Sequence, residues 1–204
     1  MRGINNMKLL RISVYSILTM LLLACGSTTK KSHTNVSGSS SIPPEKAYAY
    51  AVNELKAERF DAAIALLEIA VKQADASAEQ FVNMGIAYSR TGQYEDGLTY
   101  LSKALVLAPN NSDILNEIGL LYHEQGKFDL SRKQYEKALA ADFAHANANY
   151  NLAVLCDLYK EDIDCAIKHY EQYLASSGSD NKQVKVWLKD LAKRKQRKLA
   201  GSNQ

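Results

Sequence analysis

The feature that most constrains this chain is a residue pattern that returns every 34 positions. Steps of 34 from Ala51 reach Gly85, Gly119 and Ala153, so one column holds only small residues. Two further columns hold an aromatic residue and an alanine in three copies each: Phe60, Tyr94 and Phe128, then Ala70, Ala104 and Ala138. Small residues let two helices approach closely, and the aromatic side chain fills the space beside them. A period of this length predicts a stacked array of helical hairpins.

The most complete copy of the pattern, residues 83–110, shows what one hairpin contains. Two short helical segments flank the turn Thr91-Gly92-Gln93, and Pro109 ends the second segment. Repetition of this unit places hairpins at residues 44–77, 78–111, 112–145 and 146–177. The turn of the fourth hairpin, residues 160–164, is one residue longer than the others, and with that insertion Ala166 and Tyr170 fall into the expected columns of its second helix.

This register resembles the tetratricopeptide repeat family over about residues 44 to 175. The resemblance implies an all-α fold, a helix-turn-helix solenoid of about four repeats with a C-terminal capping helix. The capping helix is expected within residues 178–204, where Val184, Trp187, Leu188 and Leu191 follow the i, i+3, i+4, i+7 spacing of an amphipathic helix. Such a helix closes the open end of a repeat stack with a polar outer face. We expect the basic residues beyond it to form a frayed, solvated end.

Residues 1–24 have the organisation of a secretory signal peptide. Arg2, Lys8 and Arg11 supply positive charge, and residues 12–23 form an apolar run that is shorter than the roughly 20 residues needed to span a bilayer. The run ends in Leu22-Leu23-Ala24-Cys25, which resembles a bacterial lipobox. The resemblance implies cleavage before Cys25 and acylation of this cysteine, for example with palmitate, and several acyl chains give stable anchoring. The alternative is a plain signal peptide in which the cysteine is incidental.

The lipidated Cys25 and the Ser/Thr-rich residues after it, up to residue 43, are expected to form a flexible tether. The residue after Cys25 is Gly26 and not the aspartate that often retains such lipoproteins in the inner membrane. We therefore expect the protein in the bacterial cell envelope, lipid-anchored in the outer membrane and facing the periplasm.

Charge is divided unequally between the repeats and the C-terminal tail. Residues 44–181 hold 12 Lys/Arg and 21 Asp/Glu, whereas residues 182–198 hold eight Lys/Arg and one Asp. An acidic repeat array favours partners with basic segments, and we expect no nucleic acid partner. The basic tail leaves open a contact with anionic lipid headgroups, an acidic partner or nucleic acid.

Motifs that would indicate catalysis are absent from the sequence. We find no HExxH motif, no Gly-rich phosphate loop and no GxSxG elbow, so we predict no enzymatic activity, no catalytic residue, no cofactor and no metal site. The histidines of the repeats, His123, His145 and His169, stand in no metal-binding spacing and are expected at the surface or in a groove.

Two cysteines of the fourth hairpin need a separate interpretation. Cys156 lies in its first helix and Cys165 at the start of its second, and the envelope is oxidising, so a disulfide is chemically permitted. The alternative is that Cys156, which occupies the column of Tyr88 and Tyr122, is simply a small buried residue.

In tetratricopeptide repeat proteins, exposed positions on the first helix of each repeat line a groove that holds a peptide or a partner helix. Carried over column by column, the resemblance implies a groove lined by Tyr48, Val52, Glu79, Val82, Asn83, Ile86, Asp113, Asn116, Glu117, Leu120, Tyr150, Asn151 and Val154. We expect about half of these side chains to be accessible, the others packing against a neighbouring repeat or the cap. The lysines of the carboxylate clamp used by chaperone-binding members are absent, so no such clamp is predicted.

These observations favour a membrane-anchored scaffold for protein–protein interaction that assembles an envelope complex. Short lipoproteins with this repeat resemble the pilotins of type IV pilus secretins, and the fourth hairpin with the cap is also similar to repeat proteins found with TonB-type systems. One alternative is an adaptor for cell-wall hydrolases. An alternative from a different class is a thiol or redox factor that uses Cys156 and Cys165.

Overall fold

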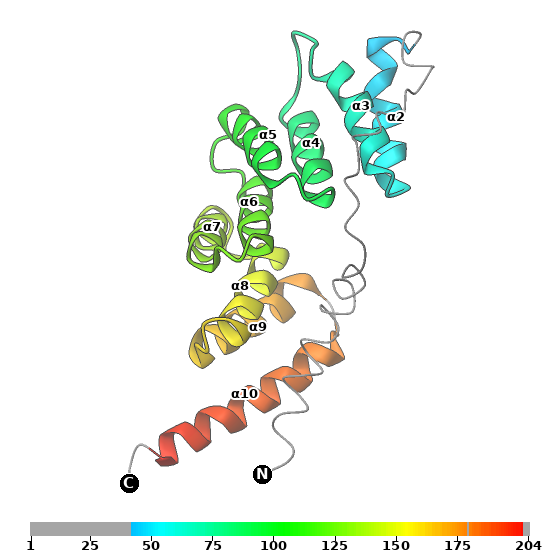
Figure 1. Cartoon of the computed structure of the whole chain (residues 1–204). Coiled ribbons are helices and arrows are strands. Elements are labelled where there is room, and N and C mark those ends of the chain that lie inside the picture. The colour runs from blue at the N-terminus through cyan, green and yellow to red at the C-terminus, as the bar shows by residue number, and fades with distance from the viewer. Residues whose placement is uncertain (1–41, 179, 202–204) are drawn as a thin grey trace, which may run out of the picture. The chain divides into compact units, whose positions relative to one another are not determined.

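The computed structural model describes residues 42–178 and 180–201, so the predicted signal peptide, Cys25 and most of the tether lie outside the described residues. Within the described ranges all regular secondary structure is helical (Figure 1). Four helix pairs follow one another and a single longer helix comes last: α2 (Pro44–Lys56) with α3 (Phe60–Ala70), α4 (Ala78–Arg90) with α5 (Tyr94–Leu107), α6 (Ser112–Glu124) with α7 (Phe128–Ala141), α8 (Ala146–Leu158) with α9 (Ile163–Ser177), and α10 (Lys182–Gly201). The predicted all-α repeat fold with a C-terminal helix is confirmed.

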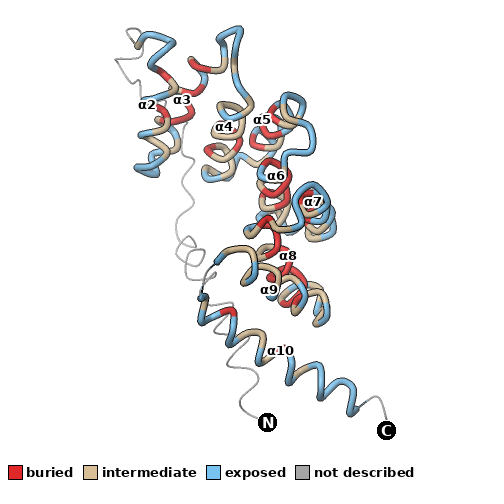
Figure 2. Tube along the Cα trace, turned by 180° about the vertical axis from the view of Figure 1, so that it is seen from behind, coloured by how far each residue is buried: buried red, intermediate tan, exposed pale blue. Residues whose placement is uncertain are grey.

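Each helix pair packs on the next pair along the chain. The first helices of the pairs, α2, α4, α6 and α8, also contact one another in that order, so together they form one continuous face, which we call the A-helix face. Helix α10 packs against α9 at the end of the row. Buried residues lie where helices meet and the outward sides are exposed (Figure 2). None of the described helices is both long and apolar enough to cross a membrane.

The column of small residues marks the places where helices approach most closely. A Cβ atom added to Gly85 would lie 2.6 Å from Leu101 Cγ, and one added to Gly97 would lie 3.0 Å from the backbone oxygen of Gly85. In the third pair, a Cβ atom on Gly119 would lie 2.6 Å from the ring of Tyr135. Contacts below 3.0 Å force a neighbour to shift, so the 34-residue period of small residues is a direct consequence of this packing.

The four turns within the pairs confirm the predicted insertion in the fourth repeat. In each turn one residue adopts a positive φ angle, and these residues are Glu58, Gly92, Gly126 and Glu161. The first three are 34 residues apart, and the fourth comes one residue later. The closing backbone hydrogen bond spans five residues in the first three turns, but in the fourth the amide of Asp162 donates to the carbonyl of Cys156, six residues earlier.

Helix α10 covers the end of the fourth pair with an apolar stripe. Val184 and Leu191 are fully buried there. The indole of Trp187 lies 5.5 Å from the ring of Tyr170 on α9, centre to centre. Asn181 caps the helix, because its side-chain oxygen accepts a hydrogen bond from the amide of Val184. This stripe agrees with the predicted capping role.

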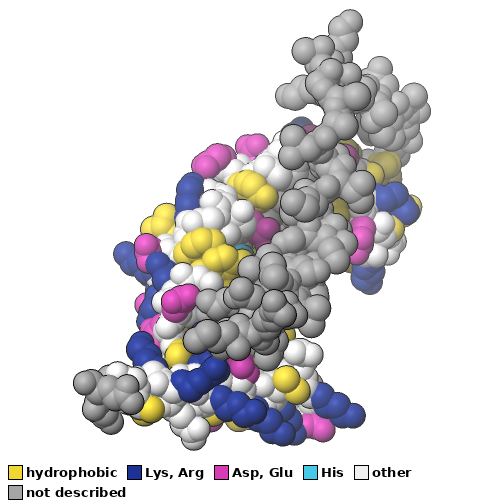
Figure 3. Space-filling model, turned by 60° about the horizontal axis from the view of Figure 1, so that its bottom comes forward, with side chains coloured by type: hydrophobic (Ala, Val, Ile, Leu, Met, Phe, Trp, Pro, Cys, Tyr) yellow, Lys and Arg dark blue, Asp and Glu magenta, His cyan; other side chains and the backbone are white. Residues whose placement is uncertain are grey.

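The basic residues beyond the stripe continue α10 as a regular helix to Gly201, so the expectation of a frayed end is wrong. Two ion pairs explain the difference. Arg194 Nη1 lies 2.6 Å from Asp157 Oδ1 of α8, and Lys195 Nζ lies 2.6 Å from Asp164 Oδ1 of α9. The basic charge of the tail therefore docks on the acidic charge of the fourth repeat, and the remaining Lys and Arg side chains of α10 form a basic band along the lower edge of the molecule in Figure 3.

Candidate partner-binding face

All the side chains predicted to line a groove belong to the A-helix face. Its aliphatic members form one column with steps of 34 residues: Val52, Ile86, Leu120 and Val154. The first three are half-buried, which leaves part of each side chain in contact with solvent. Val154 is buried, as is Asn116 with 3% exposure, so these two belong to the side chains of the predicted groove that pack against neighbouring helices. Neighbouring helices cover them.

A hydrogen bond joins the first two helices of the A-helix face. The amide Nδ2 of Asn83 on α4 donates to Tyr48 Oη on α2 over 2.8 Å. Burial, together with a hydrogen bond to Glu79 and the charge of that carboxylate, raises the pKa of Tyr48 to about 12. The phenol is therefore neutral in the physiological range, accepting from Asn83 and donating to Glu79. These three residues hold α2 and α4 in register while the carboxylate of Glu79 stays at the surface.

An equivalent bond joins α6 and α8, two repeats later. Asn151 Nδ2 on α8 donates to Asn116 Oδ1 on α6 over 3.0 Å. The two partners are 35 residues apart, as are Tyr48 and Asn83. In both pairs of helices the same two positions of the repeat therefore form a side-chain hydrogen bond between consecutive first helices. We call such a hydrogen-bonded pair a polar rung.

The start of α8 adds a second link to α6. His145 caps α8, because its Nδ1 accepts a hydrogen bond from the amide of Ala148 over 3.1 Å. An accepting Nδ1 places the proton on Nε2, which lies 2.9 Å from Asp113 Oδ1 and donates to it. The imidazole is buried, while the Asp113 side chain is largely exposed. The carboxylate of Asp113 thus remains available at the surface of the A-helix face.

The rung between α4 and α6 differs from its neighbours. Glu117 occupies the position of Asn83 and Asn151, but the residue 35 positions before it is Val82, which has no side-chain hydrogen-bonding group. Among the described residues, the hydrogen bond that the carboxylate of Glu117 accepts is a long one, 3.4 Å, from Asn116 Nδ2. Burial raises the pKa of Glu117. The hydrogen bond from the Asn116 amide and the positive charge of Arg90 partly offset this rise.

The C-terminal end of the A-helix face is closed by α10. Tyr150, predicted to line the groove, has its ring 5.2 Å from Tyr173 of α9 and 6.4 Å from Trp187 of α10, centre to centre. Tyr150 is half-buried in this aromatic group. Its ring contacts lie on α9 and α10, and the half-buried aliphatic side chains of the face lie on α2, α4 and α6.

Two residues that link helices were missed in the sequence, and the repeat pattern carries a signal for the first of them alone. His145 lies 34 residues after Asn111 and 68 after Ser77, and all three cap the first helix of a repeat with a side-chain acceptor. Asn149 connects the loop before α8 to α9: its Nδ2 donates to the carbonyls of Phe143 and His145, and its Oδ1 lies 2.9 Å from His169 Nδ1. This second group breaks the repeat pattern, so periodicity alone could not reveal it.

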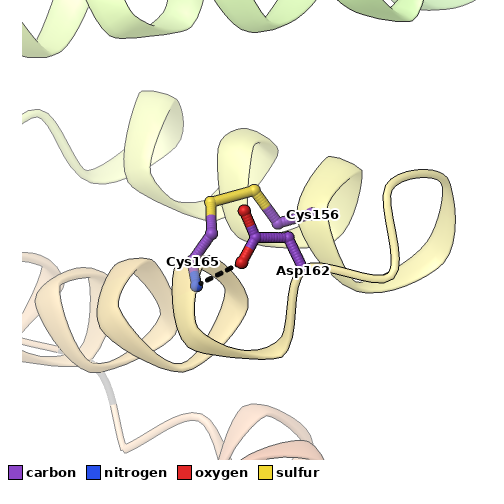
Figure 4. A group of neighbouring side chains, drawn as sticks. All are labelled: Cys156, Asp162 and Cys165. Atoms are coloured by element: carbon purple, nitrogen blue, oxygen red, sulfur yellow. Dashed lines mark hydrogen bonds between the residues drawn. A yellow bond between two sulfur atoms is a disulfide. The ribbon is translucent and has the colours of Figure 1, made fainter.

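The two cysteines of the fourth hairpin are joined in a disulfide, with their Cα atoms 5.9 Å apart (Figure 4). Asp162 lies beside them and caps α9, because its Oδ1 accepts from the amide of Cys165 over 3.1 Å. Among the described residues, these three form the group whose potential ligand atoms lie within 4.8 Å of one another. The sulfurs are bonded to each other and Asp162 is engaged with Cys165 and Arg132, so this arrangement stabilises the hairpin and is not a metal centre.

Described residues of neighbouring repeats line two cavities. One, of about 490 Å³, is lined by Phe81 and Tyr100 together with Glu68, Val71, Lys72 and Lys103. The other, of about 520 Å³, is mostly apolar and lies between the ends of α5 and α7, lined by Leu105, Pro109, Asn110, Leu115, Lys137, Ala140 and Ala141. Neither contains a constellation of catalytic side chains.

Comparison with known proteins agrees with this architecture. Models of the tetratricopeptide repeat match residues 76–142 and 117–181, which together cover just over half of the chain. A probable UDP-N-acetylglucosamine–peptide N-acetylglucosaminyltransferase, SPINDLY of Solanum lycopersicum, is 36% identical over 97 residues, which are 48% of this chain. The chain spans only 10% of the length of that relative, and the match is confined to a repeat segment.

Solved structures of repeat proteins share the fold. MamA from Desulfovibrio magneticus superposes with a TM-score of 0.63 at 20% identity, over 78% of this chain and 89% of that chain. YrrB, described as a repeat protein with an unusual peptide-binding site, superposes with a TM-score of 0.59 at 20% identity, over 72% and 74%. At this identity the likeness concerns the fold alone. The chain belongs to the tetratricopeptide repeat family, whose stacked hairpins typically serve as non-catalytic scaffolds for protein–protein interaction.

Proposed function

We propose that this protein holds a segment of a partner protein along its A-helix face while the acylated Cys25 anchors it in the bacterial envelope. The observation that carries the proposal is the combination of side chains on this face. Half-buried Val52, Ile86 and Leu120 form an aliphatic column, and the exposed carboxylates of Glu79 and Asp113 lie beside it. Such a surface suits an extended or helical segment with apolar side chains and basic flanks.

The polar rungs support a binding role because they fix the face before a partner arrives. The bonds Tyr48–Asn83 and Asn116–Asn151 hold neighbouring helices in a set spacing. A preformed surface loses less conformational freedom on binding, so more of the interaction energy appears as affinity. YrrB, a protein of the same fold, is described as having a peptide-binding site.

The envelope setting rests on the N-terminal sequence. The signal-like run and the lipobox around Cys25 support a lipoprotein in the outer membrane facing the periplasm, with an envelope protein of a pilus, secretin or TonB-type system as partner. An adaptor for cell-wall hydrolases would use the same face. A thiol or redox factor is disfavoured, because Cys156 is fully buried and Cys165 is half-buried, which limits access to the disulfide.

Site-specific photocrosslinking in the full-length chain tests the use of the face. A benzophenone amino acid at Ile86 or Leu120 should capture the same partner from living cells, and Glu79→Lys with Asp113→Lys should abolish that adduct. Val106 is the control, because it is 77% exposed and lies on α5, outside the A-helix face. Equal capture from Val106, or capture that survives both charge reversals, would contradict the proposal.

The anchor is tested independently with labelled palmitate. We expect the full-length chain to incorporate the label and to sediment with outer membranes, and Cys25→Ala to do neither. Label on the Cys25→Ala chain would contradict lipidation at this residue.

A further inference from the structure

Glu117 is the residue of the A-helix face whose environment is incomplete. The two other polar rungs pair an amide with a partner 35 residues earlier, whereas Glu117 meets Val82 at that position. The one hydrogen bond that it accepts from the part of the chain that the structure describes comes from Asn116 and is long at 3.4 Å. Among the described residues, no cation lies within 4.0 Å of its carboxylate. The carboxylate is therefore held in the middle of the face without a charged partner.

The groups around Glu117 come from three helices. Arg90 at the end of α4 and His145 at the start of α8 act favourably on its charge, and Asp113, one turn earlier on α6, acts unfavourably. Burial is the largest effect, and it raises the pKa of Glu117 above that of an ordinary glutamate. A cation interacts more strongly with such a half-buried carboxylate than with an exposed one, because fewer water molecules screen the pair of charges.

The side chains next to Glu117 also suit the stem of a long basic residue. Val82 and Ile86 on α4 and Leu120 on α6 are aliphatic and half-buried. Lysine and arginine carry three or four methylene groups before their charged end, and these groups pack favourably on apolar surface. Asp113 supplies a second, exposed carboxylate for the flank of such a ligand.

Building on the proposed function, we propose that Glu117 is a specificity subsite that receives the cationic side chain of a lysine or arginine in the bound partner segment. The ammonium or guanidinium would take the place of the hydrogen-bonding partner that Val82 does not provide, and would pair with the Glu117 carboxylate. The partner is thus a peptide segment with one anchoring basic residue, set among apolar residues that occupy the aliphatic column.

Selection from a random peptide library tests this assignment. Phage that display 12-residue peptides are selected on the full-length chain in detergent, on Glu117→Gln and on Glu124→Gln, the last being an exposed control at the end of the same helix. We expect lysine or arginine to be enriched at one fixed position on the wild type and on Glu124→Gln, and not on Glu117→Gln. Enrichment that persists on Glu117→Gln, or none on the wild type, overturns the assignment.

Binding measurements with a selected peptide sharpen the result. Replacement of its anchoring lysine by glutamine should weaken binding to the wild type about tenfold or more, and binding to Glu117→Gln less than about twofold. Circular dichroism of each variant checks that the fold is kept.

The outcomes separate the two proposals. Peptides that bind the A-helix face, shown by competition with the crosslink at Ile86, but that carry no fixed basic residue overturn only the Glu117 subsite. Failure to select any peptide that competes at Ile86 overturns both. A wild-type dimer that Glu117→Gln converts to monomers would assign the cation to a second copy of this chain and overturn a foreign partner segment as its source.

Discussion

Acidification should destabilise the fourth repeat through His169, and the geometry explains why. Asn149 uses its Nδ2 to donate to two backbone carbonyls, so its Oδ1 must accept, and the Nδ1 proton of His169 fills this role over 2.9 Å. Burial first, and then the positive charges of Lys168 and Arg132, lower the pKa of His169 from 6.5 to about 4. The folded protein therefore keeps this imidazole neutral at pH values at which an unfolded chain would protonate it.

The sign and size of the effect follow from this difference. Because the folded-state pKa is below the unfolded value, the contribution of His169 is fully present above pH 6.5 and is lost as the pH falls from 6.5 to 4. A shift of this size corresponds to about 3 kcal/mol without solvent screening. His169 is only half-buried, and screening reduces the expected loss between pH 7 and pH 4 to about 2 kcal/mol.

A matched variant separates His169 from the carboxylates that also titrate below pH 5. Asparagine at this position can donate to Asn149 from its side-chain amide but does not titrate, so His169→Asn keeps the hydrogen bond and removes the pH dependence. Urea unfolding is followed through the fluorescence of Trp187, which contacts α9 through Tyr170 and reports on the fourth repeat. The wild type should lose about 2 kcal/mol more than His169→Asn between pH 7 and pH 4.

The reasoning fails if both proteins lose the same stability over this pH range. It also fails if the additional loss in the wild type occurs above pH 6.5, because His169 is neutral there in both the folded and the unfolded chain. Unfolding of repeat arrays need not be two-state, so the comparison uses the same probe and the same transition in both proteins.

Three further outcomes are expected. Arg194→Gln removes the guanidinium bound to the buried Asp157 and should lower the stability of the fourth repeat by about 2 kcal/mol in urea unfolding, with partial recovery when Asp157→Asn is added; an unchanged midpoint would contradict a role for this ion pair. Replacement of Cys156 and Cys165 by alanine opens a short loop and should cost about 2.5 kcal/mol, and reductant should lower the melting temperature of the wild type but not that of the variant. Glu58→Gly should raise stability by about 0.5 to 1 kcal/mol because Glu58 has a φ of 55°, whereas Glu58→Ala should give no gain.

The periodic part of the structure could be predicted from the sequence because each repeat meets the same packing constraint. Small residues such as Gly85 and Gly119 lie where a Cβ atom would collide, so their spacing sets the register of the helices. The longer turn of the fourth repeat followed from the same register, and Glu161 marks it in the structure. Side chains of the A-helix face could be assigned to a column, but their exposure could not, because the burial of residues such as Val154 and Asn116 depends on how the surrounding helices pack.

Contacts that do not recur from repeat to repeat could not be predicted from the repeat pattern. The pair between Arg194 and Asp157 joins residues 37 positions apart, and no other repeat contains its equivalent. Composition alone therefore indicated a frayed basic tail, whereas the structure continues α10 as a helix to Gly201, with its last residues exposed. His145 was also misjudged, because histidine is an unusual helix cap and only its place in the column of Ser77 and Asn111 reveals the role.

The cap also limits the length of segment that the A-helix face can hold. Tyr150 is engaged with Trp187 and Val154 is buried, so the accessible face runs over α2, α4 and α6, with Glu117 on the last of these. Neighbouring packed helices lie about 8 to 10 Å apart, so three helices span about 20 Å, which an extended chain covers with about six residues. The basic residue that pairs with Glu117 should then lie at one end of a selected motif of about six residues, with apolar residues toward Ile86 and Val52. A basic residue selected in the centre of a longer motif would place the partner over α8 as well and would contradict this limit.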